Sequence, residues 1–150
     1  MKHATQSQEV WTAAEYQNFL KTKQKPNKGN KYGAVRAEWN GRKFDSTGER
    51  DYAVQLDLMK QAGEIKKVQY QYKIVLEANG QFVCNYYIDY RLVMADGSIV
   101  LAEFKGKELP DFKIKWAMVK TQLSDIEPNA TLWLVKKQDG QFVTVETFKP

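Results

Sequence analysis

The sequence predicts an α/β fold in which a mixed sheet is flanked by helices. Runs rich in aromatic and β-branched residues occur at 65–77, 82–94 and 98–106 and are typical of strands. Stretches with apolar residues at helical spacing come before and after these runs. With 150 residues, 43% of them hydrophobic, the chain can bury one core, so we expect a single domain over residues 1–150.

An N-terminal helix and a basic linker are expected over residues 1–30, ahead of a core that covers residues 31–150. Residues 7–23 predict the helix, and the turn-forming residues at 25–30 end it. The dipeptide Asn40-Gly41 then predicts a short hairpin, because Asn-Gly favours the type I′ turn.

A second helix is expected from about residue 46 to residue 62. Asp45 or Ser46 is suited to be its N-cap. Its apolar stripe comprises Tyr52, Leu56 and Met59. After the three strands, Pro110 opens another helix to about residue 124, with a buried face made of Phe112, Trp116, Val119 and Leu123. Two last strands, at 132–135 and 142–148, turn at Asp139-Gly140.

Two carboxylates are expected to face each other across a hairpin. If Ala95-Asp96-Gly97 is a three-residue loop with Gly97 in the left-handed region, Met94 pairs with Ser98. Counting back along both strands places Asp89 opposite Glu103, with side chains about 5 Å apart. Lys105 lies two residues further and shares their face. Two carboxylates beside a lysine form a site for a hard cation, with a charged group ready to orient water.

The Glu103-Phe104-Lys105 motif also has a purely structural interpretation. Glu64-Ile65-Lys66 has the same spacing but no facing aspartate, and alternating charges on a strand usually mark a solvated face. Residues 99–102, however, predict a strand buried on both faces, and charges at the end of such a strand need partners. Glu49, at the end of the apolar stripe of the second helix, is a third candidate carboxylate. Its alternative role is to stabilise the first turn of that helix.

Composition excludes several classes of protein. The single histidine, His3, removes hydrolases with a Ser-His-Asp triad, and one Cys with one His cannot supply a zinc site. A lone Cys84 excludes a disulfide framework. No apolar run reaches the roughly 20 residues that span a membrane, and no signal peptide is recognised. We therefore expect a cytoplasmic protein with no membrane association.

Positive charge is concentrated near the N-terminal third. Residues 21–43 hold eight basic residues and one acidic residue, a net charge of +7, against +5 for the whole chain. A basic segment with interleaved aromatic residues suits a polyanion backbone, and a solubilising linker is the alternative. The residues that we expect to contact DNA are Lys25, Lys28, Lys31, Tyr32, Arg36, Lys107, Lys113 and Lys115.

The order of these features resembles the PD-(D/E)xK, or restriction-endonuclease-like, superfamily. An acidic helix is followed by Asp-(x13)-Glu-x-Lys across a hairpin, and then by a helix and a strand. Ile88 stands where the superfamily label has proline. The chain more closely resembles a small phage and prophage family often labelled a domain of unknown function. The motifs that carry this resemblance are Asn30-Lys31-Tyr32-Gly33-Ala34, Phe44-Asp45-Ser46, Ala62-Gly63-Glu64-Ile65, Tyr87-Ile88-Asp89-Tyr90 and Glu103-Phe104-Lys105-Gly106.

The resemblance implies a restriction-endonuclease-like core (αβββαβ) and phosphodiester cleavage with Mg²⁺ or Mn²⁺. Carried over by position, Asp89, Glu103 and the main-chain carbonyl of Phe104 would be metal ligands. Glu49 would be the acidic residue of the first core helix and would bind a second metal or a metal-bound water. Lys105 would be the catalytic lysine that positions or activates the attacking water.

We therefore expect a Mg²⁺-dependent DNA endonuclease acting on branched or structured DNA, like a Holliday-junction resolvase, in a bacterial cell or a phage-infected host. No domain is left over to read a long DNA sequence. Two alternatives stay open: a DNA-binding or adaptor protein that keeps the fold without cutting, and a nuclease subunit active only within a larger complex. DNA is the expected partner, with a homodimer as a further option.

Overall fold

The computed structural model describes residue 14 and residues 36–150, where it has the predicted α/β class. Apart from residue 14, the helix expected over residues 7–23 and the linker that follows it lie outside the described residues. The elements, in chain order, are β1 (Ala37–Trp39), β2 (Arg42–Phe44), α2 (Thr47–Gln61), β3 (Ile65–Ala78), β4 (Gln81–Met94), β5 (Ile99–Phe104), α3 (Pro110–Ile126), β6 (Thr131–Gln138) and β7 (Gln141–Phe148). Every strand and helix predicted after residue 36 is present, with ends shifted by a few residues.

The main sheet is mixed and has the strand order β3-β4-β5-β6-β7. Strands β5 and β6 are parallel and are connected through α3, whereas the other neighbouring pairs are antiparallel. A parallel pair needs a long crossover, which α3 supplies. Strands β1 and β2 form a separate two-stranded hairpin. None of the helices among the described residues is long and apolar enough to cross a membrane.

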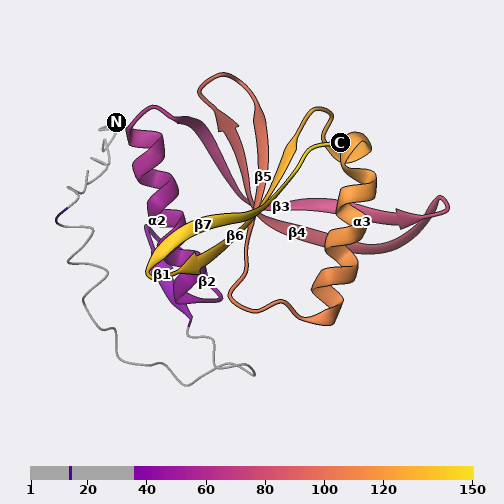
Figure 1. Cartoon of the computed structure of the whole chain (residues 1–150), viewed down its shortest axis with the longest axis horizontal. Coiled ribbons are helices and arrows are strands. Elements are labelled where there is room, and N and C mark those ends of the chain that lie inside the picture. The colour runs from indigo at the N-terminus through magenta and orange to yellow at the C-terminus, as the bar shows by residue number, and fades with distance from the viewer. Residues whose placement is uncertain (1–13, 15–35) are drawn as a thin grey trace, which may run out of the picture.

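Each face of the sheet carries its own hydrophobic core, and the two helices lie on opposite sides (Figure 1). On one side, α3 packs the predicted residues Phe112, Trp116, Val119 and Leu123 against the sheet. On the other side, α2 packs Tyr52, Ala53 and Leu56. Strand β5 lies between them, with Leu101 in the α3 core and Val100 and Ala102 in the α2 core. Its side chains are therefore buried on both faces, as its apolar sequence predicts.

The β3–β4 hairpin changes sides along its length. Ile88 belongs to the α3 core, whereas Tyr90, only two residues further, belongs to the α2 core. Residues two apart in a regular strand point to the same face, so the hairpin must turn sharply at Asp89. Gln71 occupies the facing position in β3 and has a φ of 51°, in the left-handed region. A non-glycine residue with this conformation inside a strand marks local strain.

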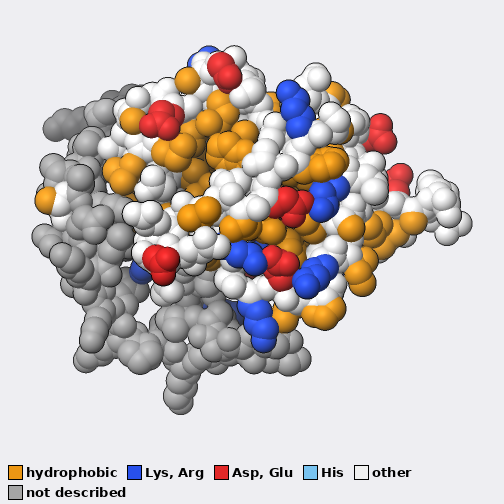
Figure 2. All heavy atoms as spheres, in the orientation of Figure 1, with side chains coloured by type: hydrophobic (Ala, Val, Ile, Leu, Met, Phe, Trp, Pro, Cys, Tyr) orange, Lys and Arg blue, Asp and Glu red, His pale blue; other side chains and the backbone are white. Residues whose placement is uncertain are grey.

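Beyond this point the hairpin protrudes from the body of the molecule (Figure 1). Its outer part exposes large apolar side chains, with Phe82 the most exposed at 64%. Figure 2 shows apolar side chains at this end of the molecule, whereas Lys, Arg, Asp and Glu side chains are interspersed over the rest of the described surface in that view.

Helix α2 approaches β5 closely at Gly48. An added Cβ at this position would lie 2.6 Å from Cε1 and Cζ of Phe104. Phe104 is buried, and its ring packs against Tyr52 and Phe142. The absence of a side chain at Gly48 therefore allows the first turn of α2 to reach the end of β5.

Gly48→Ala should destabilise the protein by about 1–2 kcal/mol. Overpacking of a core costs about 1–3 kcal/mol, and the better helix propensity of alanine offsets part of that cost. Urea denaturation followed by circular dichroism measures the change. Gly106→Ala is the control, because an added Cβ there meets nothing within 4 Å. Equal stability of the two variants would show that α2 can move away from Phe104 without cost.

A candidate carboxylate–lysine site

The site lies where β4 and β5 separate. The Met94 N–H donates to the carbonyl of Ser98 at 2.9 Å, and Gly97 has a φ of 87°, which confirms the predicted loop. The paired residues run from Val93 and Ile99 to Tyr90 and Ala102. This register would place Asp89 opposite Glu103, as predicted, but the regular pairing ends one residue earlier.

The two carboxylates replace the missing strand contacts. The Phe104 N–H donates to Asp89 Oδ2 at 3.0 Å, and the Asp89 N–H donates to Glu103 Oε2 at 3.2 Å. Each backbone amide thus finds a carboxylate acceptor at the point where the sheet opens. A buried N–H without an acceptor would cost about 1–3 kcal/mol, so these contacts hold the two acidic side chains in place.

Glu103 is almost completely buried, with 2% of its surface exposed. Lys105 Nζ lies 2.8 Å from Glu103 Oε1, and the Tyr86 hydroxyl donates to the same oxygen at 2.9 Å. A buried carboxylate is tolerated only when it is paired and hydrogen-bonded. Lys105 follows the end of β5, and its N–H donates to the carbonyl of Val135 in β6 at 2.9 Å. The predicted strand over residues 98–106 is therefore shorter, but Lys105 is still fixed to the sheet.

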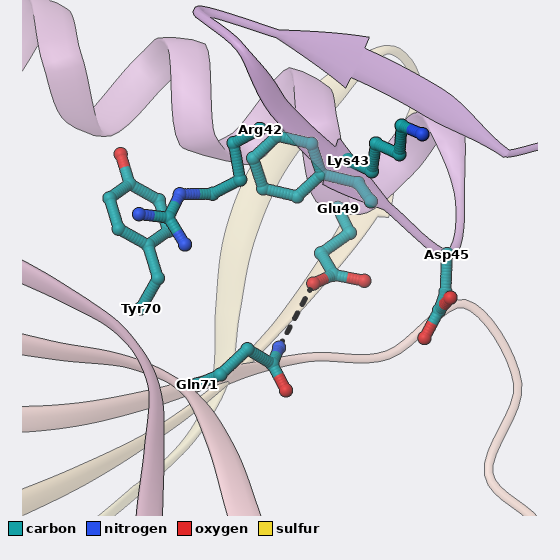
Figure 3. A pocket seen from close by; sticks show the side chains of 7 residues that line it. Arg42, Lys43, Asp45, Glu49, Tyr70 and Gln71 are labelled. Carbon is teal, nitrogen blue, oxygen red and sulfur yellow. Dashed lines mark hydrogen bonds between the residues drawn. The ribbon is translucent and has the colours of Figure 1, made fainter.

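Glu49 comes to the site from the first turn of α2. The Ser46 side chain caps this helix by accepting from the Glu49 N–H at 3.1 Å, as predicted for a residue of this type. The Tyr90 hydroxyl donates to the Glu49 carbonyl at 2.7 Å and joins the helix to β4. Glu49 is therefore held by its backbone, while its side chain points toward β3 (Figure 3).

Gln71 connects Glu49 with Asp89. Its Nε2 lies 3.4 Å from Glu49 Oε1 and 3.3 Å from Asp89 Oδ1, and Figure 3 shows the first of these contacts. The structure thus brings together Glu49, Asp89, Glu103 and Lys105, the four residues that the sequence singles out. It adds Gln71 and Tyr86, which sequence analysis missed, because neither a glutamine nor a tyrosine in a strand carries a recognisable signal before the chain has folded.

Burial and repulsion by neighbouring charges make Glu49 and Asp89 hard to ionise. Burial, followed by the charges of Asp45 and Glu103, raises the pKa of Glu49 to about 7. Burial and the charges of Glu103 and Glu49 raise the pKa of Asp89 well above its ordinary value. Burial alone would lower the pKa of Lys105, but the Glu103 carboxylate beside it raises the pKa above its usual range. Lys105 therefore keeps its proton, and it lies beside two acids, Glu49 and Asp89, whose protonated forms are favoured.

The donor set fits a hard divalent cation by ligand type. The site offers carboxylate and amide oxygens, which Mg²⁺ and Mn²⁺ prefer, and no sulfur or imidazole ligand. Within residues 36–150, no three His, Cys, Asp or Glu side chains already converge as a metal-binding group. The carboxylates instead accept N–H groups, and the Gln71 amide lies between Glu49 and Asp89.

The expected DNA contacts fall into two groups. Lys25, Lys28, Lys31 and Tyr32 lie outside the described residues. Arg36, Lys107 and Lys113 are exposed, and Lys115 is half-buried. The start of α3, which carries Lys113 and Lys115, is near the site, because the Phe112 ring lies 4.8 Å from Lys105 Nζ. Trp116 is a core residue, as expected.

Comparison with known proteins identifies one family. The family model described as "Protein of unknown function (DUF1064)" matches residues 29–139. No curated protein and no solved structure matches the chain.

The stability of the metal-free protein should fall as the pH rises from about 4.5 to about 7. The pKa of Glu49 is raised on folding, so the folded state binds its proton more tightly and loses this advantage above pH 7. Glu49→Gln should reduce this dependence, leaving the part that comes from Asp89, and should stabilise the protein at pH 8 by about 2 kcal/mol. Denaturation in EDTA at pH 5 and pH 8 measures both effects.

Glu64→Gln serves as the control, since Glu64 is exposed and lies outside the cluster. A Glu49→Gln variant that is less stable than the wild type at pH 8 would contradict the prediction. It would mean that attraction to Lys105 outweighs the burial of the carboxylate.

Proposed function

Since the chain belongs to the DUF1064 family of proteins of unknown function, we propose its activity from the carboxylate–lysine site: it is a divalent-metal-dependent DNA endonuclease of the PD-(D/E)xK type. One observation carries the proposal. Asp89 and Glu103 lie at the opening between two neighbouring strands, with Lys105 paired to Glu103. A protein that only binds DNA would gain nothing from the buried Glu103 carboxylate, because burying a charge costs stability.

The order of elements supports the proposal. Helix α2, strands β3, β4 and β5, helix α3 and strand β6 follow the αβββαβ order of a restriction-endonuclease-like core. The candidate residues lie at the opening of the central strands and at the start of α2. Sites with strongly shifted pKa values at such positions are frequently functional.

Each residue has a proposed role in phosphodiester hydrolysis. Asp89, Glu103 and the main-chain carbonyl of Phe104 would hold Mg²⁺ or Mn²⁺, and Glu49 would hold a second ion or its water. The cation supplies polarisation of the phosphoryl oxygen and lowers the pKa of bound water. Lys105 keeps its proton, and its ammonium group orients the attacking water and offsets the charge that develops on the phosphate. Tyr86 positions Glu103 through its hydroxyl.

Asp89→Asn and Glu103→Gln should each lower Mg²⁺-dependent cleavage by about 100-fold or more, because a lost anionic ligand removes several kcal/mol of transition-state stabilisation. Each amide keeps one oxygen to accept the backbone N–H, and in Glu103→Gln the Tyr86 hydroxyl can rotate to accept from the new amide NH2, so the fold should persist. Cleavage of linear, nicked and four-way DNA in Mg²⁺, with circular dichroism as a check of folding, tests both variants.

The exposed residues Glu64 and Lys66 provide matched controls, because they have the same spacing as Glu103 and Lys105 but no facing aspartate. Glu64→Gln and Lys66→Ala should cut at the wild-type rate, whereas Lys105→Ala should slow turnover and spare metal binding. Wild-type activity in Asp89→Asn would overturn the mechanism. A wild-type protein that binds DNA without cutting any of these substrates would favour the adaptor alternative.

DNA affinity should respond to the lysines in the first turns of α3 and just before it. If Lys107, Lys113 and Lys115 contact phosphates, changing all three to alanine should lower the salt slope of duplex binding by up to about 2.7, or about 0.9 per contact. The loss should be the same for all sequences, because backbone contacts position a protein without reading bases. Binding measured in Ca²⁺ at several salt concentrations, without turnover, gives the slope.

The salt slope of a second triple variant, with Lys25, Lys28 and Lys31 changed to alanine, tests the N-terminal basic segment in the same way. The variant with the larger change in slope identifies the main DNA-binding surface. An unchanged slope in both would exclude the two surfaces as phosphate contacts.

A further inference from the structure

A pocket of about 240 Å³ opens directly beside the carboxylate–lysine site. The β1–β2 hairpin supplies Arg42 and Lys43 to its lining, and β3 supplies Tyr70 and Gln71. Glu49 completes the wall toward the carboxylates (Figure 3). Because Gln71 also contacts Asp89, a ligand in this pocket would adjoin the proposed catalytic residues.

One wall of the pocket is flat and firmly held. The Arg42 guanidinium lies 4.0 Å from the centroid of the Tyr70 ring, and Figure 3 shows it reaching over that ring. Tyr70 is itself held by edge-to-face contacts with Phe44 and Tyr90. The Tyr70 ring lies on one side of the guanidinium, and because Arg42 is exposed, its other side is open to a second flat group, such as a nucleobase.

The charges of the pocket suit a nucleotide. Among the described residues, neither Arg42 nor Lys43 forms an ion pair with an acidic side chain, and both are exposed. They can meet a phosphate while a base stacks on Arg42. Figure 3 shows Arg42 beside Tyr70, whereas Glu49 and Asp45 lie away from that ring and Glu49 points toward Gln71, next to the position proposed for the cation.

A base in continuous duplex DNA must leave its stack before it can enter such a pocket. Both of its faces are covered by stacking, and pulling it out costs a few kcal/mol. The cost is least for a base that is mismatched or already single-stranded. A pocket that receives one base next to the cleaved bond therefore favours DNA with unpaired nucleotides.

We propose that this pocket binds one unpaired nucleotide beside the bond that is cut. The inference rests on the proposed nuclease activity and names its substrate class: DNA with an unpaired nucleotide at a flap, gap or branch. Arg42 is the specificity-determining residue, because its guanidinium plane stacks on the base and its positive charge attracts a backbone phosphate.

Binding of two DNA probes of equal length in Ca²⁺ tests the proposal. One is a continuous duplex, and the other carries a short single-stranded flap. The wild type should bind the flap DNA about 10-fold more tightly, a ratio within the range that stacking of one base supplies. Arg42→Lys keeps the positive charge and loses the plane. It should therefore leave duplex affinity unchanged and bring the ratio close to 1.

Lys66→Ala is the control, since Lys66 is exposed, is not part of the pocket and is not among the expected DNA contacts, and it should keep the 10-fold ratio. Equal losses of Arg42→Lys on both probes, or an unchanged ratio, would overturn the proposal. A wild type that cuts both DNAs in Mg²⁺ with no preference would refute the pocket's role and leave the nuclease proposal standing. A wild type that neither binds nor cuts either DNA would refute both.

Discussion

Two backbone amides must find acceptors where β4 leaves β5, and the carboxylates of Asp89 and Glu103 provide them. The central strand is buried on both faces, so water cannot readily replace the missing strand partner. This requirement fixes the two acidic side chains at the opening of the sheet. Lys105 and Tyr86 then satisfy Glu103, and Gln71 links Asp89 to Glu49. The cluster therefore depends on one interruption in a ladder of hydrogen bonds.

Such a cluster opposes folding. The shifts in the pKa values of Glu49 and Asp89 show that their ionised forms are disfavoured in the folded protein. The left-handed backbone of Gln71 adds strain at the same place. The two hydrophobic cores on either side of the sheet compensate for these costs. Strained backbone next to acids with shifted pKa values is frequent at functional sites and is consistent with the proposed function.

Local chemistry in the sequence predicted much of this arrangement. The Ala95-Asp96-Gly97 loop set the register of Asp89 and Glu103, and Ser46 marked the start of α2, because turns and caps depend on a few adjacent residues. The early end of the β4–β5 ladder and the bridging role of Gln71 were not predictable. Both arise from the turning of the β3–β4 hairpin between two cores, and contacts between elements leave no local trace in the sequence.

The different chain separations within the site have a consequence for its assembly. Asp89 and Glu103 are 14 residues apart in one hairpin, whereas the contact between Glu49 and Tyr90 spans 41 residues. Closing a shorter loop loses less chain entropy. Hence the pair of carboxylates, together with Lys105, forms a compact module within consecutive residues. Helix α2 brings Glu49 to this pair by packing against the Phe104 ring at Gly48, which has no side chain. Loop-closure entropy therefore favours formation of the hairpin pair first, and Glu49 joins the site when α2 docks.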